Sequence, residues 1–206
     1  MAPQVKLVYF DARGRAELLR LILHQSGVKF EDVRIAFADW PTTKPKLPFD
    51  AVPYLEIDGK AFNESLCLAR FAARRHGLIG KTDIDALHAD QVLAQTDDLR
   101  QRMIRIKFDS VCTEDQKKEL KKKFEEEQLP AYLDKMNKQL EANKSGFFVG
   151  DALTMAELAV YDITENPVKE NPKVLDKYPK IAAMRKMVES LPNLKDYLKN
   201  RKDTPM

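Results

Sequence analysis

The sequence predicts an α/β unit followed by an all-helical unit, and three observations support this prediction. The first third of the chain alternates β-branched and aromatic segments with segments that carry apolar residues at helical spacing. After about residue 80 the apolar spacing is almost entirely helical. This change happens once along the 206 residues, so we expect two domains, residues 1–80 and 81–206.

The first unit begins with a predicted strand, helix and strand. Val5–Phe10 is β-branched and aromatic, and residues 14–26 carry apolar side chains at helical spacing before Gly27, which suits a C-terminal cap. A second strand is predicted around residues 30–35. The short connections between these elements predict a right-handed βαβ unit with two parallel strands.

A long loop and a hairpin complete the first unit. Residues 38–53 are predicted to form a loop, because their four prolines remove backbone donors and disfavour both helix and strand. Asp58-Gly59, between the apolar segments 54–57 and 60–62, is typical of a type I′ hairpin turn. A helix from Ser65 then ends at a glycine, which completes a βαβ, loop, ββ, α order.

The second unit is predicted to contain only helices. Thr154 and Glu157 can form a capping box, with Leu153 and Leu158 as its hydrophobic staple. The lysine-rich segment 117–123 is interrupted and followed by glutamates, which indicates a solvated helix face. The expected helices are 84–107, 113–142, 154–165, 178–190 and 194–200.

Composition excludes several classes of function. The 35 Lys and Arg residues are interleaved with 32 Asp and Glu residues, and the formal charge of +3 does not suit a nucleic-acid-binding surface. No apolar run approaches the roughly 20 residues that a membrane crossing requires. Cys67 and Cys112 stand alone, and the first residues lack the features of a secretory signal. We therefore expect a cytoplasmic protein with no membrane or nucleic-acid partner.

Known catalytic motifs do not locate a site, because phosphate-binding loops, dinucleotide fingerprints and zinc-ligand spacings are all lacking. The three histidines, at 24, 76 and 88, stand singly in helical patterns and are expected to be structural. Polar residues instead gather where predicted strands end and helices begin, the usual ligand site of an α/β sheet. They are Tyr9, Arg13, Arg15, Trp40, Lys44 and Ser65.

A series of short motifs carries a resemblance that extends over nearly the whole chain. They are Val8-Tyr9-Phe10 with Arg13-Gly14-Arg15-Ala16-Glu17, Ala38-Asp39-Trp40-Pro41, Leu47-Pro48-Phe49, Val52-Pro53, Glu64-Ser65-Leu66 with Ala69-Arg70, Asp97-Asp98, and Phe148-Val149-Gly150-Asp151 with Leu153-Thr154. In this order they resemble the sigma-class glutathione transferases, of the kind common in nematodes.

That resemblance implies a thioredoxin-like N-terminal domain that binds glutathione, an all-helical C-terminal domain over an apolar second-substrate pocket, and a homodimer. No cofactor or metal is expected, and glutathione is the co-substrate. Tyr9 matches the catalytic tyrosine and Arg15 an active-site arginine. The remaining glutathione-binding positions are Trp40, Lys44, Asp50, Ala51, Val52, Pro53, Glu64, Ser65 and Asp98.

Individual roles follow from the same resemblance. Trp40 and Lys44 match the residues that hold the glycine carboxylate of glutathione. Val52 matches the residue whose backbone pairs with the cysteinyl part, and Pro53 the family's cis proline. Ser65 matches the binder of the γ-glutamyl carboxylate. Asp98 matches the acid that reaches the γ-glutamyl ammonium from the other subunit.

Some positions depart from the family pattern. Asp50-Ala51 replaces a common Gly-Gln pair and Glu64 replaces a common Gln, so glutathione affinity is expected to be reduced. The positions that serve metal activation and prostaglandin isomerisation in some relatives correspond to Ala94, Arg105 and Ile163, which disfavours that activity. The expected walls of the second-substrate pocket are Phe10, Ala12, Gly14, Arg105, Ala159 and Ile163.

The chemistry of these residues suits activation of a thiol. Lowering a thiol pKa from about 8.5 by about two units requires roughly 2.7 kcal/mol of thiolate stabilisation. One charge-assisted hydrogen bond contributes about 1.5–3 kcal/mol. A tyrosine keeps its proton at neutral pH and can donate it to sulfur, so Tyr9 is expected to act as a donor rather than a base.

The leading hypothesis is a glutathione transferase that presents the thiolate to electrophiles or peroxides. A second hypothesis is a non-catalytic relative, either a binding protein for haem or apolar ligands or a crystallin-like protein. Retention of Tyr9 and Arg15 favours catalysis, whereas the loss of the Gln before Ser65 mildly favours the second hypothesis. A third is a glutathione-dependent prostaglandin isomerase.

Overall fold

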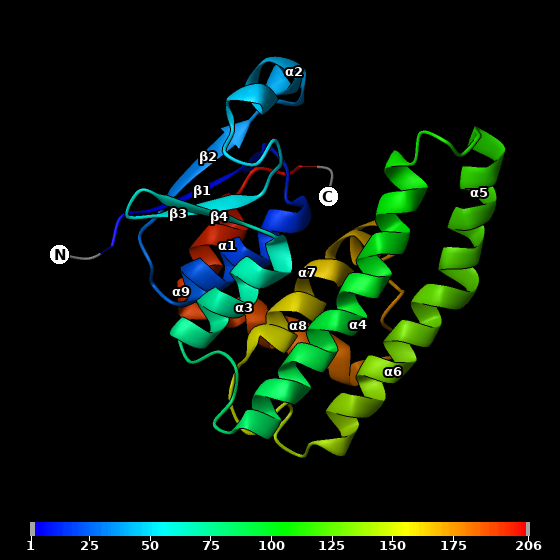
Figure 1. Cartoon of the computed structure of the whole chain (residues 1–206). Helices are drawn as coiled ribbons and strands as arrows, with labels where there is room; N and C mark the ends of the chain where they lie inside the picture. Colours follow the sequence, from blue (N-terminus) through cyan, green and yellow to red (C-terminus); the bar gives the residue numbers. More distant parts are fainter. Residues whose placement is uncertain (1–2, 205–206) are drawn as a thin grey trace. The chain divides into compact units, whose positions relative to one another are not determined.

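A computed structural model of the chain describes residues 3–204 (Figure 1). By packing, the chain divides into two compact units. The first runs up to Leu78 and takes in the segment from Glu189 onward, and the second is Ile79–Val188. The sequence prediction drew a boundary near residue 80 but kept everything after it together, whereas the last helix, α9 (Pro192–Asn200), packs on α1 (Glu17–Gln25) of the first unit.

The first unit is built on a four-stranded mixed sheet with the order β2-β1-β3-β4. β1 pairs in parallel with β2 and antiparallel with β3, so β1 is hydrogen-bonded along both edges. This confirms the predicted βαβ order followed by a hairpin. The strands are β1 (Val5–Phe10), β2 (Glu31–Ile35), β3 (Tyr54–Ile57) and β4 (Lys60–Asn63).

The predicted hairpin turn is also confirmed. Asp58 and Gly59 have φ angles of 49° and 79°, the positive values that a type I′ turn requires at both central residues. Asp58 also links this turn to the residue just before β1, since its carboxylate accepts a hydrogen bond from the backbone N–H of Gln4 at 2.9 Å.

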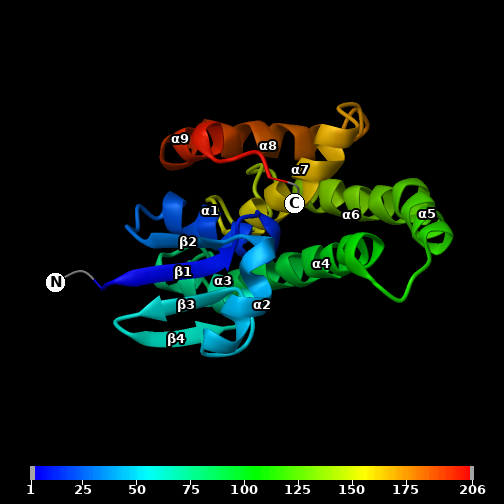
Figure 2. The same cartoon turned by 90° about the horizontal axis from the view of Figure 1, so that it is seen from above.

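Helices α1 and α3 (Ser65–Arg75) lie on one face of the sheet, and the α2 segment lies off the opposite face (Figures 1 and 2). The inner side of α3 is formed by Leu68 and three alanines, whose small side chains let the helix approach α1 closely. On the opposite face of the sheet, Val8, Ile35 and Tyr54 form a buried cluster. The sheet is therefore covered on both faces, and β1 is held in the middle of the unit.

The prediction of an irregular loop at 38–53 was wrong for its first half. Three short helical turns occupy it: η2 (Phe37–Asp39), α2 (Trp40–Thr43) and η3 (Lys44–Lys46). Pro41 and Pro45 both stand in the first turn of such a segment. A proline is tolerated there because the N–H that it lacks has no intrahelical partner in that position.

The second unit is helical, as predicted. Its α4 and α7 pack together, and the buried core includes Leu93, Leu140, Leu158 and Ile181. The last of its helices, α8, ends just beyond the division between the units. The helices are α4 (Asp83–Phe108), α5 (Glu114–Lys123), α6 (Leu129–Ala142), α7 (Met155–Glu170) and α8 (Pro179–Ser190).

The single helix predicted for 113–142 is divided by a π-helical turn, η4 (Phe124–Gln128). Pro130, at the start of α6, has no N–H to complete the regular pattern, and the N–H of Leu129 reaches back to the carbonyl of Phe124. α7 continues to Glu170, past the predicted end at residue 165.

The predicted capping box of α7 is present. The Thr154 hydroxyl accepts the N–H of Ala156 at 3.2 Å, and a Glu157 carboxylate oxygen accepts the N–H of Thr154 at 2.7 Å. Both residues are buried. Burial raises the pKa of Glu157, and the N–H donors of Phe148 and Thr154 partly offset that rise.

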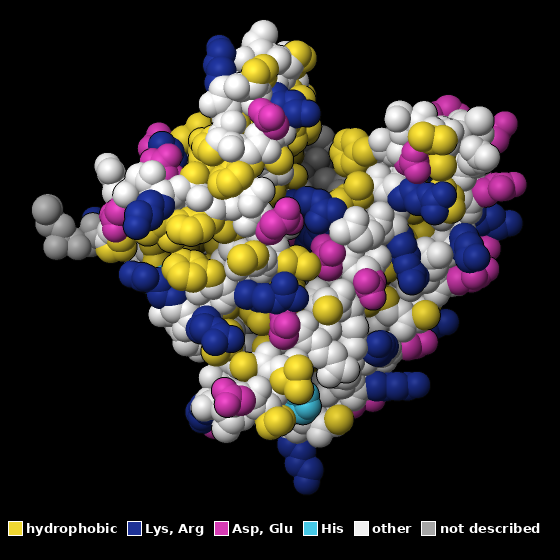
Figure 3. Space-filling model, in the orientation of Figure 1, with side chains coloured by type: hydrophobic (Ala, Val, Ile, Leu, Met, Phe, Trp, Pro, Cys, Tyr) yellow, Lys and Arg dark blue, Asp and Glu magenta, His cyan; other side chains and the backbone are white. Residues whose placement is uncertain are grey.

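The lysine-rich helix α5 has the solvated face that the sequence predicted. Lys118 is exposed and pairs with Asp115 at 3.0 Å, one turn earlier. Figure 3 shows basic and acidic side chains mixed along this part of the second unit. In the part of the chain that the structure describes, no helix is both long and apolar enough to cross a membrane.

Candidate active site

Tyr9 lies near the end of the central strand β1, with its side chain 8% exposed. The backbone N–H of Arg15 donates a hydrogen bond to the Tyr9 Oη at 3.1 Å. Because this bond uses Oη as an acceptor, the phenol proton is left to be donated elsewhere. Within residues 3–204 no acceptor is recorded for that proton, so a bound ligand can receive it.

Gly14 fits the closest part of this turn. Its φ is +45°, and a Cβ added there would lie 2.6 Å from the Tyr9 Oη and 2.9 Å from a ring carbon. Any other residue would therefore displace the phenol as well as strain the backbone. The sequence prediction made Gly14 a wall of the second-substrate pocket, and its observed contact is with Tyr9.

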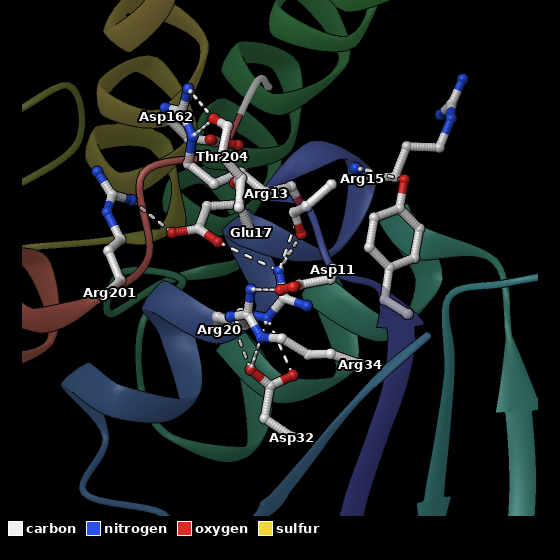
Figure 4. A network of polar contacts seen from close by, with 12 residues as sticks. Asp11, Arg13, Arg15, Glu17, Arg20, Asp32, Arg34, Asp162, Arg201 and Thr204 are labelled. Carbon is white, nitrogen blue, oxygen red and sulfur yellow. Dashed lines mark hydrogen bonds and ion pairs between the residues drawn. The ribbon is translucent and has the colours of Figure 1, made fainter. Parts of the chain in front are cut away.

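Arg15 lies in a short 3₁₀ helix, η1 (Gly14–Ala16), which directly precedes α1. It is half-buried, and its side chain points away from the buried polar groups of the neighbouring loop (Figure 4). Arg15 contacts the Tyr9 hydroxyl through its backbone N–H.

The Val52–Pro53 peptide bond is cis, as the family resemblance implied. Val52 is half-buried against the cluster of Val8, Ile35 and Tyr54, which ties this bend to β1. Asp50 and Ala51, just before the bend, are exposed, and Asp50 has a φ of 49°.

Ser65 is the first residue of α3, and Glu64 precedes it with a φ of 69°. The Glu64 side chain does not cap the helix and is exposed. The first N–H groups of a helix have no intrahelical acceptors and favour an anion. Ser65 is half-buried at this terminus. Its hydroxyl and the free N–H groups of the first helical turn together suit a carboxylate ligand.

Trp40 belongs to an aromatic cluster beside β1. Its ring meets Phe10 edge-on with centroids 4.9 Å apart, and Phe10 stacks on Phe37 at 4.7 Å. Trp40 is half-buried, whereas Lys44, one turn further along, is exposed. The cluster holds the helical turns that carry Trp40 and Lys44 against the end of β1.

A buried charged network below this site was missed by the sequence analysis (Figure 4). Arg20 is fully buried, and its Nη1 donates to the carbonyl of Ala12 at 2.8 Å and to Glu17 at 3.3 Å. Its Nε donates to Asp32 at 3.1 Å, and Asp32 also pairs with Arg34 at 2.8 Å. The signal was an acidic and a basic residue three positions apart inside the buried helical segment 17–23, where no solvated face is available.

Two comparisons with known families cover most of the chain. Residues 5–74 match the family model of the glutathione S-transferase N-terminal domain, and residues 97–201 match that of the glutathione S-transferase C-terminal domain. The chain belongs to the glutathione S-transferase family. The match of both models, in order, agrees with the mixed sheet and the helical second unit described above.

Individual glutathione S-transferase relatives span the same length. The chain is 35% identical over 208 residues to glutathione S-transferase 1 of Ascaris suum, covering 98% of this chain and 99% of that protein. It is 34% identical over 205 residues to S-crystallin SL11 of Nototodarus sloanii, covering 98% of each. The solved sigma-class GST of Fasciola hepatica superposes with a TM-score of 0.86 at 33% identity and covers 99% of each chain.

Four of the predicted site residues lie in the second unit, on helices α4 and α7. Asp98 is exposed on α4, and Arg105 is exposed and pairs with Asp109 at 3.5 Å. Ala159 and Ile163, on α7, are 0% and 2% exposed. Both residues are therefore buried, and their expected role as walls of the second-substrate pocket stays a prediction.

Metal ligands were not expected at this site. Among residues 3–204, no three His, Cys, Asp or Glu side chains are grouped so that they could hold a metal ion. Cys67 is exposed, Cys112 is partly exposed, and neither forms a disulfide.

Proposed function

We propose that this glutathione S-transferase activates the thiol of glutathione with the Tyr9 hydroxyl, for attack on apolar electrophiles or on peroxides. The observation that carries the proposal is the Arg15 N–H bound to the Tyr9 Oη at 3.1 Å, which orients the phenol and leaves its proton to a ligand. A thiolate that accepts this proton in a hydrogen bond gains about 1.5–3 kcal/mol. That range includes the roughly 2.7 kcal/mol that a two-unit fall in thiol pKa requires.

Glutathione binding is proposed at the residues around Tyr9. The bend at Val52–Pro53 offers a backbone edge to the cysteinyl part, and the α3 terminus at Ser65 offers N–H groups to the γ-glutamyl carboxylate. Trp40 and Lys44 would hold the glycine carboxylate. The exposed Glu64 places a negative charge beside Ser65, so we expect glutathione affinity to be modest.

The second substrate is proposed to be apolar and held by the first unit near Phe10, Ala12 and Gly14. Proximity then supplies much of the rate, because two bound reactants meet without a bimolecular encounter.

A homodimer is part of the proposal. The first unit exposes four phenylalanines at 37–55% of their surface, and exposed apolar side chains in such number are typical of a protein–protein interface. They are Phe37, Phe49, Phe62 and Phe71. Asp98 of a partner subunit would then complete the glutathione site. Sedimentation analysis at micromolar concentration tests this, and a monomer with full activity would remove Asp98 from the site. A cytoplasmic location, where free thiols persist, completes the proposal.

The test compares Tyr9→Phe with the matched variant Tyr54→Phe, which removes a hydroxyl from the neighbouring strand β3. Conjugation of a chlorinated aromatic substrate should fall by about 10- to 100-fold in Tyr9→Phe, as expected for one charge-assisted hydrogen bond, and stay near wild type in Tyr54→Phe. Equal rates in all three proteins would exclude Tyr9 from the mechanism.

The similarity to S-crystallin SL11 keeps a non-catalytic binding or structural role as the second candidate. Trp40 is the only tryptophan, so its fluorescence reports on the glutathione site alone. A saturable change on adding glutathione, without conjugation of any electrophile, would favour the non-catalytic role. No change in fluorescence would argue against the glutathione site itself.

A further inference from the structure

We propose that the C-terminal segment from Tyr197 to Thr204, here termed the C-terminal strap, positions the loop that holds Tyr9. This inference rests on the proposed role of Tyr9 in activating the thiol. It assigns a task to residues that lie about 190 positions beyond the catalytic strand and that carry no role in the proposed chemistry.

The loop of residues 11–15 determines where the phenol oxygen lies. Arg15 provides the N–H that binds the Tyr9 Oη, and Gly14 leaves no room for even one added carbon beside it. A shift of the loop would therefore either weaken this hydrogen bond or displace the ring. The loop needs firm anchors on its far side.

Only part of this anchoring is local. The N–H of Asp11 donates to the carbonyl of Ile35 at 2.9 Å, which continues the pairing of β1 with β2. The buried Arg20 donates to the carbonyls of Ala12 and Arg13 at 2.8 and 3.3 Å. Arg20 is itself held by Glu17 and Asp32, so the position of the loop depends on these two carboxylates.

The C-terminal strap supplies further anchors at two points of the loop. The buried Arg13 side chain donates from Nε and Nη2 to the carbonyl oxygen of Thr204, at 3.4 and 3.3 Å. Lys202 pairs with the carboxylate of Asp11 at 2.8 Å, and this contact lowers the pKa of Asp11. Figure 4 shows Thr204 beside Arg13.

The C-terminal strap also provides two hydrogen-bond donors to the carboxylate of Glu17. Its Oε1 accepts the Tyr197 hydroxyl at 2.9 Å and Nη1 of Arg201 at 2.5 Å, while Oε2 accepts from Arg20. Glu17 is fully buried, so without these donors its carboxylate would lack the partners that a buried charge requires. Figure 4 shows Glu17 between Arg201 and Arg20.

These contacts make the strap a positioning element for catalysis rather than a binding element for glutathione. The Tyr9 hydroxyl acts on the ionised sulfur, so a displaced loop should reduce kcat and raise the pKa of bound glutathione. None of the strap residues belongs to the proposed glutathione site, so KM for glutathione should change little.

The experiment compares a chain that ends at Lys202 with a control chain that ends at Pro205, in which the carbonyl of Thr204 stays part of a peptide bond. The shorter chain lacks the carbonyl that Arg13 binds. We expect kcat to fall about tenfold at nearly constant KM, the pH profile of kcat to move to higher pH, and amide exchange of residues 10–16 to become faster. The chain ending at Pro205 should behave as the full chain does.

A second pair of variants guards against unfolding of the shortened chain. Tyr197→Phe removes only the hydroxyl that binds Glu17, and Lys199→Gln changes an exposed residue on the same helix. Tyr197→Phe should reproduce the pH shift at about threefold lower kcat, and Lys199→Gln should not.

Unchanged kcat and pH profile in both the Lys202-terminated chain and Tyr197→Phe would overturn the positioning role, even where the exchange rate increases. The full chain and Tyr9→Phe are measured alongside. If the full chain shows no glutathione-dependent reaction, or if Tyr9→Phe matches it, the proposed function itself fails and the strap has no reaction to serve.

Discussion

Helices α1 and α5 each carry an acidic and a basic residue three positions apart, in opposite surroundings. In α1, Glu17 and Arg20 meet at 3.3 Å with both side chains 0% exposed. In α5, Glu114 and Lys117 meet at 3.0 Å with side chains 82% and 23% exposed. The shorter pair is the weaker one, because an exposed pair replaces water contacts of similar strength. In the buried pair, a charge that loses its partner cannot be solvated by water, so removing one partner is strongly destabilising.

The largest expected effect comes from breaking the buried pair. Glu17→Gln removes the charge opposite Arg20 and weakens the bonds from Tyr197 and Arg201, so we expect the free energy of unfolding to fall by about 3 kcal/mol. The matched variant Glu114→Gln should change it by less than about 0.5 kcal/mol. Urea unfolding followed by circular dichroism measures both, and similar losses would contradict the contrast drawn between the two helices.

The same contrast applies to helix caps. Thr154 caps α7 in a buried capping box, whereas Thr113 caps α5 with an exposed one. Thr154→Ala should lower the free energy of unfolding by about 2 kcal/mol and Thr113→Ala by about 0.5–1 kcal/mol, the upper and lower parts of the usual range. Chemical unfolding of the two variants tests this order, and an equal cost would mean that burial adds nothing to a cap.

A smaller effect is expected from a histidine inside the first unit. His24 stacks on Tyr197 with centroids 4.0 Å apart, and burial lowers its pKa below the ordinary 6.5 despite the nearby carboxylates of Glu17 and Asp32. The unfolded chain therefore binds a proton more readily than the folded chain. Stability is complete above pH 6.5 and declines as the pH falls below it towards the folded-state pKa.

Thermal unfolding between pH 7.5 and 5 measures this decline. His24→Phe keeps a ring against Tyr197 and should flatten the decline. His76 also has a lowered pKa, because its imidazole is partly desolvated. It is more exposed than His24, so His76→Gln should change the decline in stability less. A decline that survives His24→Phe unchanged would assign it to other groups.

Sequence patterns were most reliable where a local rule determines the backbone. The residues of β1, the Asp58-Gly59 turn and the Thr154 capping box all formed as predicted, because each depends on side chains within a few positions of one another. The candidate site residues of the first unit were predicted from several motifs that occur together in one order. Their roles remain proposals.

Patterns failed where distant parts of the chain decide the outcome. Prolines indicated a loop at 38–53, yet helical turns form at 37–46, where Trp40 contacts Phe10. The return of α9 to the first unit left no local trace. The charge of Glu17 was visible, but its partners Tyr197 and Arg201 lie more than 170 positions away.

By itself, the amino-acid order determined the strands, most helices, the caps and the family, since these follow from periodicity and from motifs that are short in sequence. Only the tertiary structure decided which charges are buried, which turn meets the Tyr9 hydroxyl and which end of the chain supports it. The physical reason is that the free energy of a charge or a hydrogen bond depends on the solvent it has lost, and that loss is set by neighbours distant in sequence.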